Sequence, residues 1–273
     1  MLFMFAVITG KEAVYQNGGI FRKGFSVKAV AYPGGSYRLV TLKSRRVKWK
    51  KLSGELGAAA AHAVVCNGIV LPADCGIIPQ DTAEISYVFL KNAVEYLLLN
   101  TPIPIQKRRA TIIDLRGVYH DLARVMAKYC ALLKVVTLHR ESYDHLSEQL
   151  REEFGAVMQI TDVMDHPNDN LMIVSPKGFG ADFAGAVTVP VITLEPEQFK
   201  GVETVSGFSA ADLSVFNLTL PEGVNLLQLA AVLYGVETHR ELKNFLPGRC
   251  VLDKRELTLQ NILEERFSLD TGE

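Results

Sequence analysis

Between residues 108 and 194, short apolar segments alternate with amphipathic segments long enough to be helices. The amphipathic segments, 118–133 and 142–154, repeat apolar residues every three or four positions, and Ser142 is expected at a helix N-cap. The apolar segments are expected to be strands, at 110–115, 135–138, 157–161, 171–174 and 187–194. This alternation predicts right-handed βαβ units and a parallel sheet. The expected fold class is therefore α/β, with helices flanking the sheet.

The chain on either side of this region has a different pattern of apolar and polar residues. Residues 1–104 are expected to form a β-rich α+β domain, with strands at 3–9, 19–21, 26–31 and 37–42 in a small antiparallel sheet. A largely apolar helix is expected from Thr82 to Asn100, and two prolines after it mark the junction with the α/β domain, residues 105–200. Residues 201–273 are expected to form a C-terminal helical segment that packs on one or both domains, with helices at 224–233, 237–245 and 256–267.

Charge and cysteine content narrow the classes of function. With 29 Lys and Arg against 30 Asp and Glu, the net charge is −1, so no overall field attracts nucleic acid or an anionic membrane. The apolar start, Met1 to Ile8, has no basic residue before it, as a signal peptide would, and is shorter than a membrane span of about 20 residues. The expected location is the cytoplasm. The four cysteines lack zinc-site spacing, so buried reduced thiols and no metal are predicted.

Polar residues follow several predicted strands, at the ends where parallel sheets bind ligands. The predicted ligand-binding set is Asp114, Arg116, Gly117, His139, Arg140, Lys177 and Gly178. The three basic side chains predict a small anionic ligand, which the backbone amide of Gly178 would also meet. A dinucleotide site needs G-x-G-x-x-G after the first strand, but this turn holds only Gly117, and Asp114 adds a negative charge. The turn therefore predicts no dinucleotide cofactor.

The turn after the second predicted strand reads Leu138-His-Arg-Glu-Ser142, and the helix after it leads to Gly155-Ala156. In these features residues 108–194 resemble the NADP-binding, Rossmann-like domain of the shikimate dehydrogenase family. The resemblance implies NADP as cofactor, an oxidoreductase activity, and binding of the 2′-phosphate by Arg140. It covers about a third of the chain, and the glycines that bind phosphate in that family are absent. Residues 1–100 hold no counterpart of the family's substrate-binding Asn-Val-Thr segment with its catalytic lysine.

Three interpretations of function remain open. The leading one is a degenerate Rossmann-like module that binds a small anionic ligand or a protein partner, including a second copy of the chain, in a binding or regulatory role with no catalytic residue assigned. The second is an NADP-dependent oxidoreductase. The third is nucleic-acid binding through the basic run 43–51 around Trp49, although a solvated strand edge is the commoner explanation of such a run. The acidic loop 162–169 holds oxygen ligands for a metal, but such loops usually just face water.

Overall fold

The structure is a computed structural model that describes residues 5–11, 14–18, 24–33, 35–178, 187–210, 213, 216–236 and 245–267, without the side chains of residues 58–62. The chain forms two compact units. Unit 1 comprises Met1–Ile85 and Ala210–Phe245, and unit 2 comprises Ser86–Ser209 and Leu246–Glu273. The chain therefore passes between the units near residues 85, 209 and 245, whereas the sequence suggested boundaries near 104 and 200.

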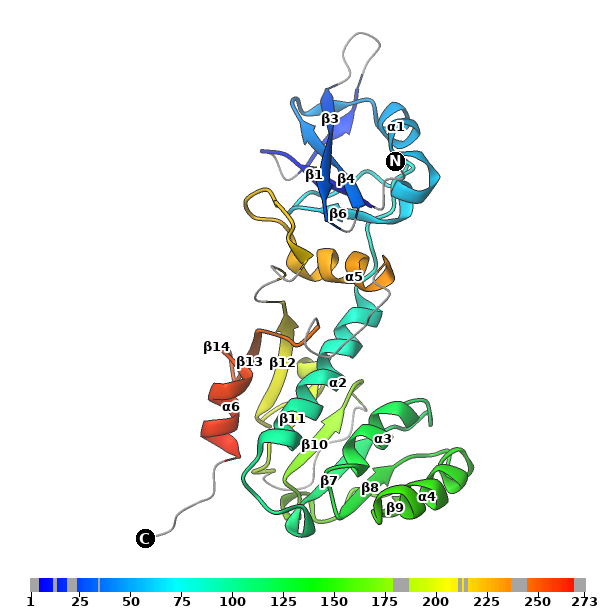
Figure 1. The fold of residues 1–273 in the computed structure, drawn as a ribbon, viewed down its shortest axis with the longest axis vertical. Coiled ribbons are helices and arrows are strands. Elements are labelled where there is room, and N and C mark those ends of the chain that lie inside the picture. Colours follow the sequence, from blue (N-terminus) through cyan, green and yellow to red (C-terminus); the bar gives the residue numbers. More distant parts are fainter. Residues whose placement is uncertain are drawn as a thin grey trace. The chain divides into compact units, whose positions relative to one another are not determined.

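Unit 2 is built on a sheet of eight strands in the order β14-β13-β12-β11-β10-β7-β8-β9 (Figure 1). The strands are β7 (Arg109–Ile113), β8 (Leu132–Val136), β9 (Val157–Thr161), β10 (Met172–Ser175), β11 (Val191–Thr193), β12 (Thr204–Ser209), β13 (Arg249–Leu252) and β14 (Arg255–Leu257). Strands β7 to β12 pair in parallel, and β13 and β14 add antiparallel pairs. Numbered along the chain, the parallel strands run 3-2-1-4-5-6 across the sheet, which is the Rossmann strand order. The predicted fold class is confirmed.

The helices of unit 2 are α3 (His120–Ala127), α4 (Glu141–Phe154), α6 (Leu259–Arg266) and most of α2 (Ala83–Asn100). Three single-turn helices lie in the connections: η1 (Ile105–Lys107), η2 (Pro167–Asp169) and η3 (Pro196–Gln198). Helices α3 and α4 lie side by side after β7 and β8 (Figure 1). Among the described residues, no helix is both long enough and apolar enough to span a bilayer.

The predicted N-cap of α4 was wrong. Arg140 already has helical backbone angles, φ −54° and ψ −44°, so the helical conformation starts before Ser142. Ser142 lies in the first turn, where its Oγ donates to the carbonyl oxygen of His139 at 2.7 Å. The hydroxyl therefore holds the turn between β8 and α4 rather than capping the helix.

The C-terminal segment differs from the helical one expected. It contains strands β12, β13 and β14 of the large sheet, besides α6 and α5 (Leu226–Val236), which belongs to unit 1. Strands β13 and β14 were missed because they are short and carry exposed charged residues, and the six residues of β12 were included in the segment expected to be helical. Most of the helix predicted at 237–245 lies outside the described residues.

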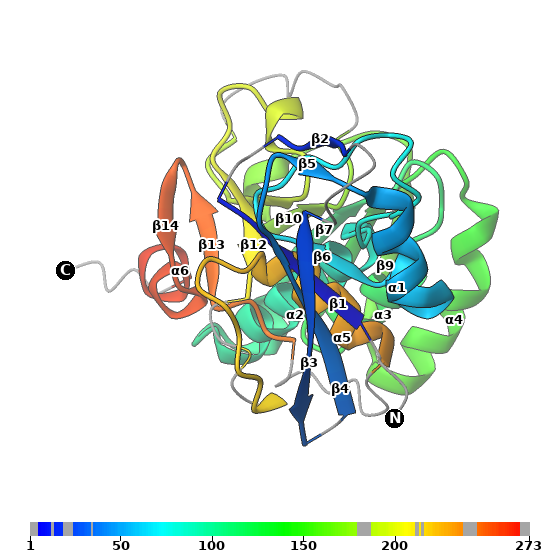
Figure 2. The ribbon, with the colours of Figure 1, turned by 90° about the horizontal axis from the view of Figure 1, so that it is seen from above.

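Unit 1 holds a four-stranded sheet in the order β3-β4-β1-β6 and a two-stranded sheet of β2 and β5. Its elements are β1 (Phe5–Thr9), β2 (Gln16–Asn17), β3 (Phe25–Tyr32), β4 (Gly35–Leu42), β5 (Arg46–Val47), α1 (Trp49–His62), β6 (Val64–Cys66) and α5. Only the β3–β4 hairpin is antiparallel within the larger sheet (Figure 2). The expected antiparallel sheet was wrong because β1 is central and pairs in parallel on both sides, as its run of four fully buried residues indicates. The strand predicted at 19–21 lies outside the described residues.

All four cysteines are buried and free, as predicted. Burial raises the pKa of Cys66, Cys130 and Cys250 to about 12. These thiols are therefore protonated at neutral pH and pack as small apolar groups.

The side chain of Arg108 secures the C-terminal end of α2. It is 7% exposed. Its guanidinium donates to the carbonyl oxygen of Leu98 in the last turn of α2 and to those of Thr101 and Ile103 just beyond. Carbonyls at a helix end have no partner within the helix, and the planar guanidinium serves several of them at once. Because Arg108 directly precedes β7, these bonds also fix where the first parallel strand begins.

Arg108→Met is expected to lower the free energy of unfolding by about 3 kcal/mol, because buried carbonyls lose their donor. Urea denaturation followed by circular dichroism measures this loss. The matched control is Arg109→Met, at the exposed neighbouring position, for which a change within about 0.5 kcal/mol is expected. Equal stabilities of the two variants would contradict the structural role given to Arg108.

Candidate functional site

The candidate site lies where the strand order of unit 2 reverses. In open α/β sheets, ligands bind beyond the carboxyl ends of the two strands at such a point. Here these strands are β7 and β10, since the chain continues from β7 to one side of the sheet and from β10 to the other. A pocket of about 520 Å³ opens at these strand ends. Its walls come from the turn after β7 (Ile113, Asp114, Leu115, Arg116, Val118 and Tyr119), from Lys177 and Gly178 after β10, and from Glu195 after β11.

Asp114 is the most buried charged group in this wall, with 1% of its surface exposed. Its Oδ2 accepts a hydrogen bond from the backbone N–H of Tyr119 at 2.7 Å and another from the hydroxyl of Tyr143 at 2.6 Å. Tyr119 is the N-cap residue of α3, so the carboxylate sits at the amino end of that helix. In dinucleotide folds the pyrophosphate takes this position. An internal anion therefore occupies it here.

The turn from β7 to α3 departs from the dinucleotide fingerprint at each glycine. Six residues, Asp114–Tyr119, separate the strand from the helix. Aligned with G-x-G-x-x-G, they place Asp114, Arg116 and Tyr119 at the three glycine positions. The glycine that is present, Gly117, has φ 65° and makes the tight turn. A Cβ on it would lie 2.3 Å from Oγ of Ser142, so the space beside Gly117 is filled by the turn after β8.

Two tyrosines hold the carboxylate of Asp114, Tyr143 with its hydroxyl and Tyr119 with its backbone N–H. Burial, followed by the hydrogen bond to Asp114, raises the pKa of Tyr143, and burial also raises the pKa of Tyr119. Both phenols are therefore protonated at neutral pH, and that of Tyr143 donates to Asp114 rather than acting as a base. The ring of His120 meets that of Tyr143 edge-on at 4.7 Å.

A second polar cluster adjoins this wall. Burial alone would raise the pKa of Asp121, but hydrogen bonds from Lys91 and Tyr87 outweigh burial and lower it. The ring of Tyr87 lies 5.2 Å from that of Tyr119. The cluster thus ties α2 to the start of α3 and supports the pocket wall from behind.

Two of the three predicted basic residues meet in the pocket. Arg116 and Lys177 are exposed and approach it from opposite sides of the switch point. The backbone N–H of Gly178, which was expected to meet the anion, donates instead to Oε2 of Glu195 at 3.0 Å. The wall therefore carries two cations and two carboxylates, so any ligand there would meet both signs of charge.

His139 and Arg140 lie outside this pocket wall. Both are exposed in the turn after β8, and Nδ1 of His139 lies 3.4 Å from a carboxylate oxygen of Glu141. Sequence reasoning missed Glu195 and Tyr143. Glu195 follows β11 closely. Lys177 was predicted because it follows a strand of the parallel sheet, and the same reasoning applies to Glu195. Tyr143 gave no such signal, because its apolar spacing on α4 predicted only a core residue.

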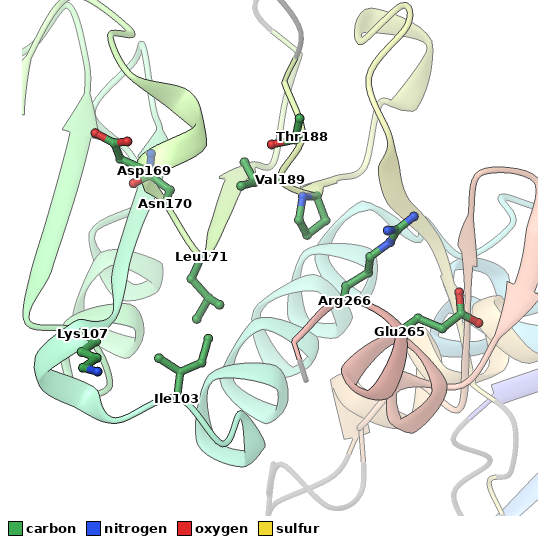
Figure 3. Close-up of a pocket in the computed structure, with 10 residues that line it drawn as sticks. Ile103, Lys107, Asp169, Asn170, Leu171, Thr188, Val189, Glu265 and Arg266 are labelled. Carbon is green, nitrogen blue, oxygen red and sulfur yellow. The ribbon is translucent and has the colours of Figure 1, made fainter. Parts of the chain in front are cut away.

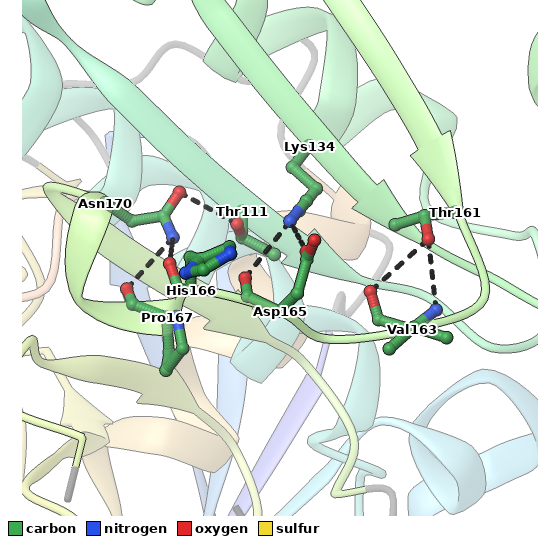
Figure 4. A network of polar contacts seen from close by, with 8 residues as sticks. All are labelled: Thr111, Lys134, Thr161, Val163, Asp165, His166, Pro167 and Asn170. Carbon is green, nitrogen blue, oxygen red and sulfur yellow. Dashed lines mark hydrogen bonds and ion pairs between the residues drawn. The ribbon is translucent and has the colours of Figure 1, made fainter. Parts of the chain in front are cut away.

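The acidic loop between β9 and β10 is tied to the sheet (Figure 4). Asp165 forms an ion pair with Lys134 of β8, and its carbonyl oxygen accepts from the same ammonium at 3.1 Å. Asn170 accepts from the hydroxyl of Thr111 on β7 at 2.9 Å. Burial lowers the pKa of Lys134. Among the described residues no group of three or more His, Cys, Asp or Glu side chains could hold a metal ion, and Asp165 serves a structural ion pair.

Two other pockets are weaker candidates. One of about 480 Å³ lies at the amino ends of the unit 2 strands, between the segments that precede β7, β10 and β11 and the end of α6 (Figure 3). This is the end of the sheet at which such folds do not bind their ligands. The other, in unit 1, is lined by the basic residues that start α1. Trp49 there is 1% exposed, so its ring offers no face for a base to stack on.

No family model matches the chain, and no curated protein matches it. Among solved structures, L-tryptophan dehydrogenase from Nostoc punctiforme is 13% identical over 85% of this chain and 69% of its own, with a TM-score of 0.37. Quinate dehydrogenase from Corynebacterium glutamicum, in complex with NAD, is 11% identical over 82% and 87%, with a TM-score of 0.32. For the minor L-lactate dehydrogenase from Enterococcus mundtii, 9% identical with a TM-score of 0.23, the match spans 32% of this chain and 38% of that enzyme. Likenesses at these scores assign neither a family nor an activity, and the fold assignment rests on the strand order.

Gly117→Ala is expected to destabilise the protein more than Gly155→Ala, although the two glycines have similar φ angles of 65° and 67°. A Cβ at Gly155 meets nothing within 4 Å. The free energy of unfolding of that variant is therefore lowered only by the strain of the left-handed backbone, about 1 kcal/mol. At Gly117 the clash with Ser142 adds to the strain, for a total of about 3 kcal/mol. Urea denaturation compares the two variants. Equal losses would mean that the turn after β8 moves aside freely.

Proposed function

We propose that unit 2 binds a small anionic ligand in the pocket at the carboxyl ends of β7 and β10. The observation that carries this proposal is the meeting of Arg116 and Lys177 in one pocket at the switch point. Ligand sites in proteins typically enclose about 300–1,000 Å³, and this pocket of about 520 Å³ lies within that range. The exposed apolar side chain of Val118 in the wall adds a surface for a non-polar part of the ligand.

The ligand of this proposal is smaller than a dinucleotide. A pyrophosphate at the amino end of α3 would meet the carboxylate of Asp114, and the approach beside Gly117 is filled by Ser142. Both features weaken the ordinary dinucleotide pose. A single phosphate or carboxylate between Arg116 and Lys177 needs neither the amino end of α3 nor the space beside Gly117.

A second candidate function is an NADP-dependent oxidoreductase resembling the shikimate dehydrogenase family. It is favoured by the Rossmann strand order and by Arg140, which is exposed after β8, where an arginine accommodates the 2′-phosphate in folds of this kind. NADP would then have to bind with its pyrophosphate away from the start of α3. The two candidates depend on different arginines, and a binding experiment separates them.

Isothermal titration calorimetry with inorganic phosphate, adenosine monophosphate and NADP tests the proposal. Arg116→Gln and Lys177→Gln are each expected to weaken binding of the two smaller anions at least tenfold, because a hydrogen bond to a charged group contributes about 1.5 kcal/mol or more. Both side chains are exposed, so the variants should keep their stability.

The matched control is Arg140→Gln, which leaves the pocket wall intact. Unchanged affinity for phosphate in this variant supports the switch-point site. If NADP alone binds, and Arg140→Gln weakens it tenfold, the oxidoreductase replaces the first proposal. If none of the three compounds binds, both the anion site and the oxidoreductase are wrong.

A further inference from the structure

Opposite charges line the switch-point pocket without neutralising one another. The cations are Arg116 and Lys177, and the carboxylates are Asp114 and Glu195. Among the described residues, none of these four side chains belongs to an ion pair. A ligand of one sign would be attracted by two of them and repelled by the others, whereas a ligand that carries both signs gains from each.

Glu195 is the carboxylate that a ligand can reach. Asp114 is 1% exposed, whereas Glu195 is half-buried. Oε2 of Glu195 accepts from the backbone N–H of Gly178, and the backbone N–H of Glu195 donates to the hydroxyl of Thr193, both at 3.0 Å. These bonds fix the carboxylate at the end of β11. Its other oxygen, Oε1, has no partner among the described residues and, unlike Oδ1 of Asp114, is not enclosed by protein atoms.

The charges of Glu195 and Arg116 act on the same part of the pocket wall. The side chain of Tyr119 lies in that wall, and its pKa is raised by burial first and then by Asp114 and Glu195, while Arg116 lowers it. Nearby charges shift a pKa in this way, so the carboxylate from the end of β11 and the guanidinium from the turn after β7 both lie near this phenol. A ligand beside the ring of Tyr119 is therefore within reach of both signs of charge.

We infer that the ligand is a small zwitterion, with a primary ammonium group beside its phosphate or carboxylate. The anionic group contacts Arg116 and Lys177, and the ammonium group donates to Oε1 of Glu195. An ammonium group only donates and a carboxylate only accepts, so their hydrogen bond is charge-assisted. This inference rests on the proposed function of the pocket. It adds the ligand class, since it separates aminoalkyl phosphates and amino acids from plain anions of the same size.

The test compares phosphoethanolamine with propyl phosphate by isothermal titration calorimetry on the full chain. The two probes match in length, and an ammonium group in the first takes the place of a methyl group in the second. The wild-type protein is expected to bind phosphoethanolamine about tenfold more tightly, because only its ammonium group can donate to Glu195. β-Alanine and butyrate form the corresponding pair with a carboxylate, and the pair that shows the preference identifies the anionic group.

Glu195→Gln keeps an oxygen for the N–H of Gly178 but removes the charge. In this variant the preference should fall to about threefold or less, because the remaining amide makes no charge-assisted bond to an ammonium group. The matched control is Glu197→Gln, which removes the same charge from an exposed position of η3 outside the pocket wall. The control should keep the preference of the wild-type protein.

The outcomes separate this inference from the proposal on which it rests. If neither pair shows the preference in the wild-type protein, the inference is wrong and the anion site stands as long as inorganic phosphate binds. A preference that persists in Glu195→Gln, or that Glu197→Gln lowers equally, also overturns it. If Glu195→Gln does not fold, the wild-type comparison decides alone. If none of the four probes binds, and inorganic phosphate does not bind either, the proposed function itself fails.

Discussion

The carboxylate of Asp114 at the amino end of α3 determines what this sheet can bind. A helix start presents unpaired N–H groups, and in dinucleotide-binding proteins of this strand order a ligand phosphate satisfies them. Here the protein supplies its own anion, held by Tyr119 and by the buried Tyr143. Hydrogen bonds to a charged group contribute about 1.5–3 kcal/mol each, so a ligand phosphate would have to displace a strongly held group of the same sign. The same interaction that stabilises the turn thus disfavours a ligand phosphate at the start of α3.

The strand order and the turn chemistry are separate properties of the chain. The order 3-2-1-4-5-6 places a crevice between β7 and β10 whatever residues line it. Which ligand enters depends on side chains, and the same fold carries many activities. In this protein Arg116 stands where a close approach to pyrophosphate would need glycine, and in the proposed function it and Lys177 hold an anion further from the backbone.

The sequence predicts most of the parallel sheet, because its strands are continuous apolar runs between amphipathic helices. It fails where that contrast is lost, since β13 and β14 are short with exposed charges. For β1 the continuous apolar run was itself a sign of parallel pairing, which the turn-rich segments around it obscured. At the site, Arg116 and Lys177 were predicted because both follow strands of the parallel sheet, and that position in the chain can be read from the sequence alone. The hydrogen bond from Tyr143 to Asp114 was not, since 29 positions separate the two residues and only the packing of α4 brings them together.

Close packing beside Gly117 explains why the open space lies on one side of β7 and not on the other. With φ 65° and no side chain, Gly117 brings the turn after β7 against His139 and Ser142 in the turn after β8. The hydroxyl of Ser142 donates to the carbonyl oxygen of His139, which holds its Oγ on the side that faces Gly117. The space beside Gly117, between the ends of β7 and β8, is therefore filled by backbone and short side chains. The pocket at these strand ends opens toward β10, where Lys177 and Glu195 line it, and that is where the proposed ligand would bind.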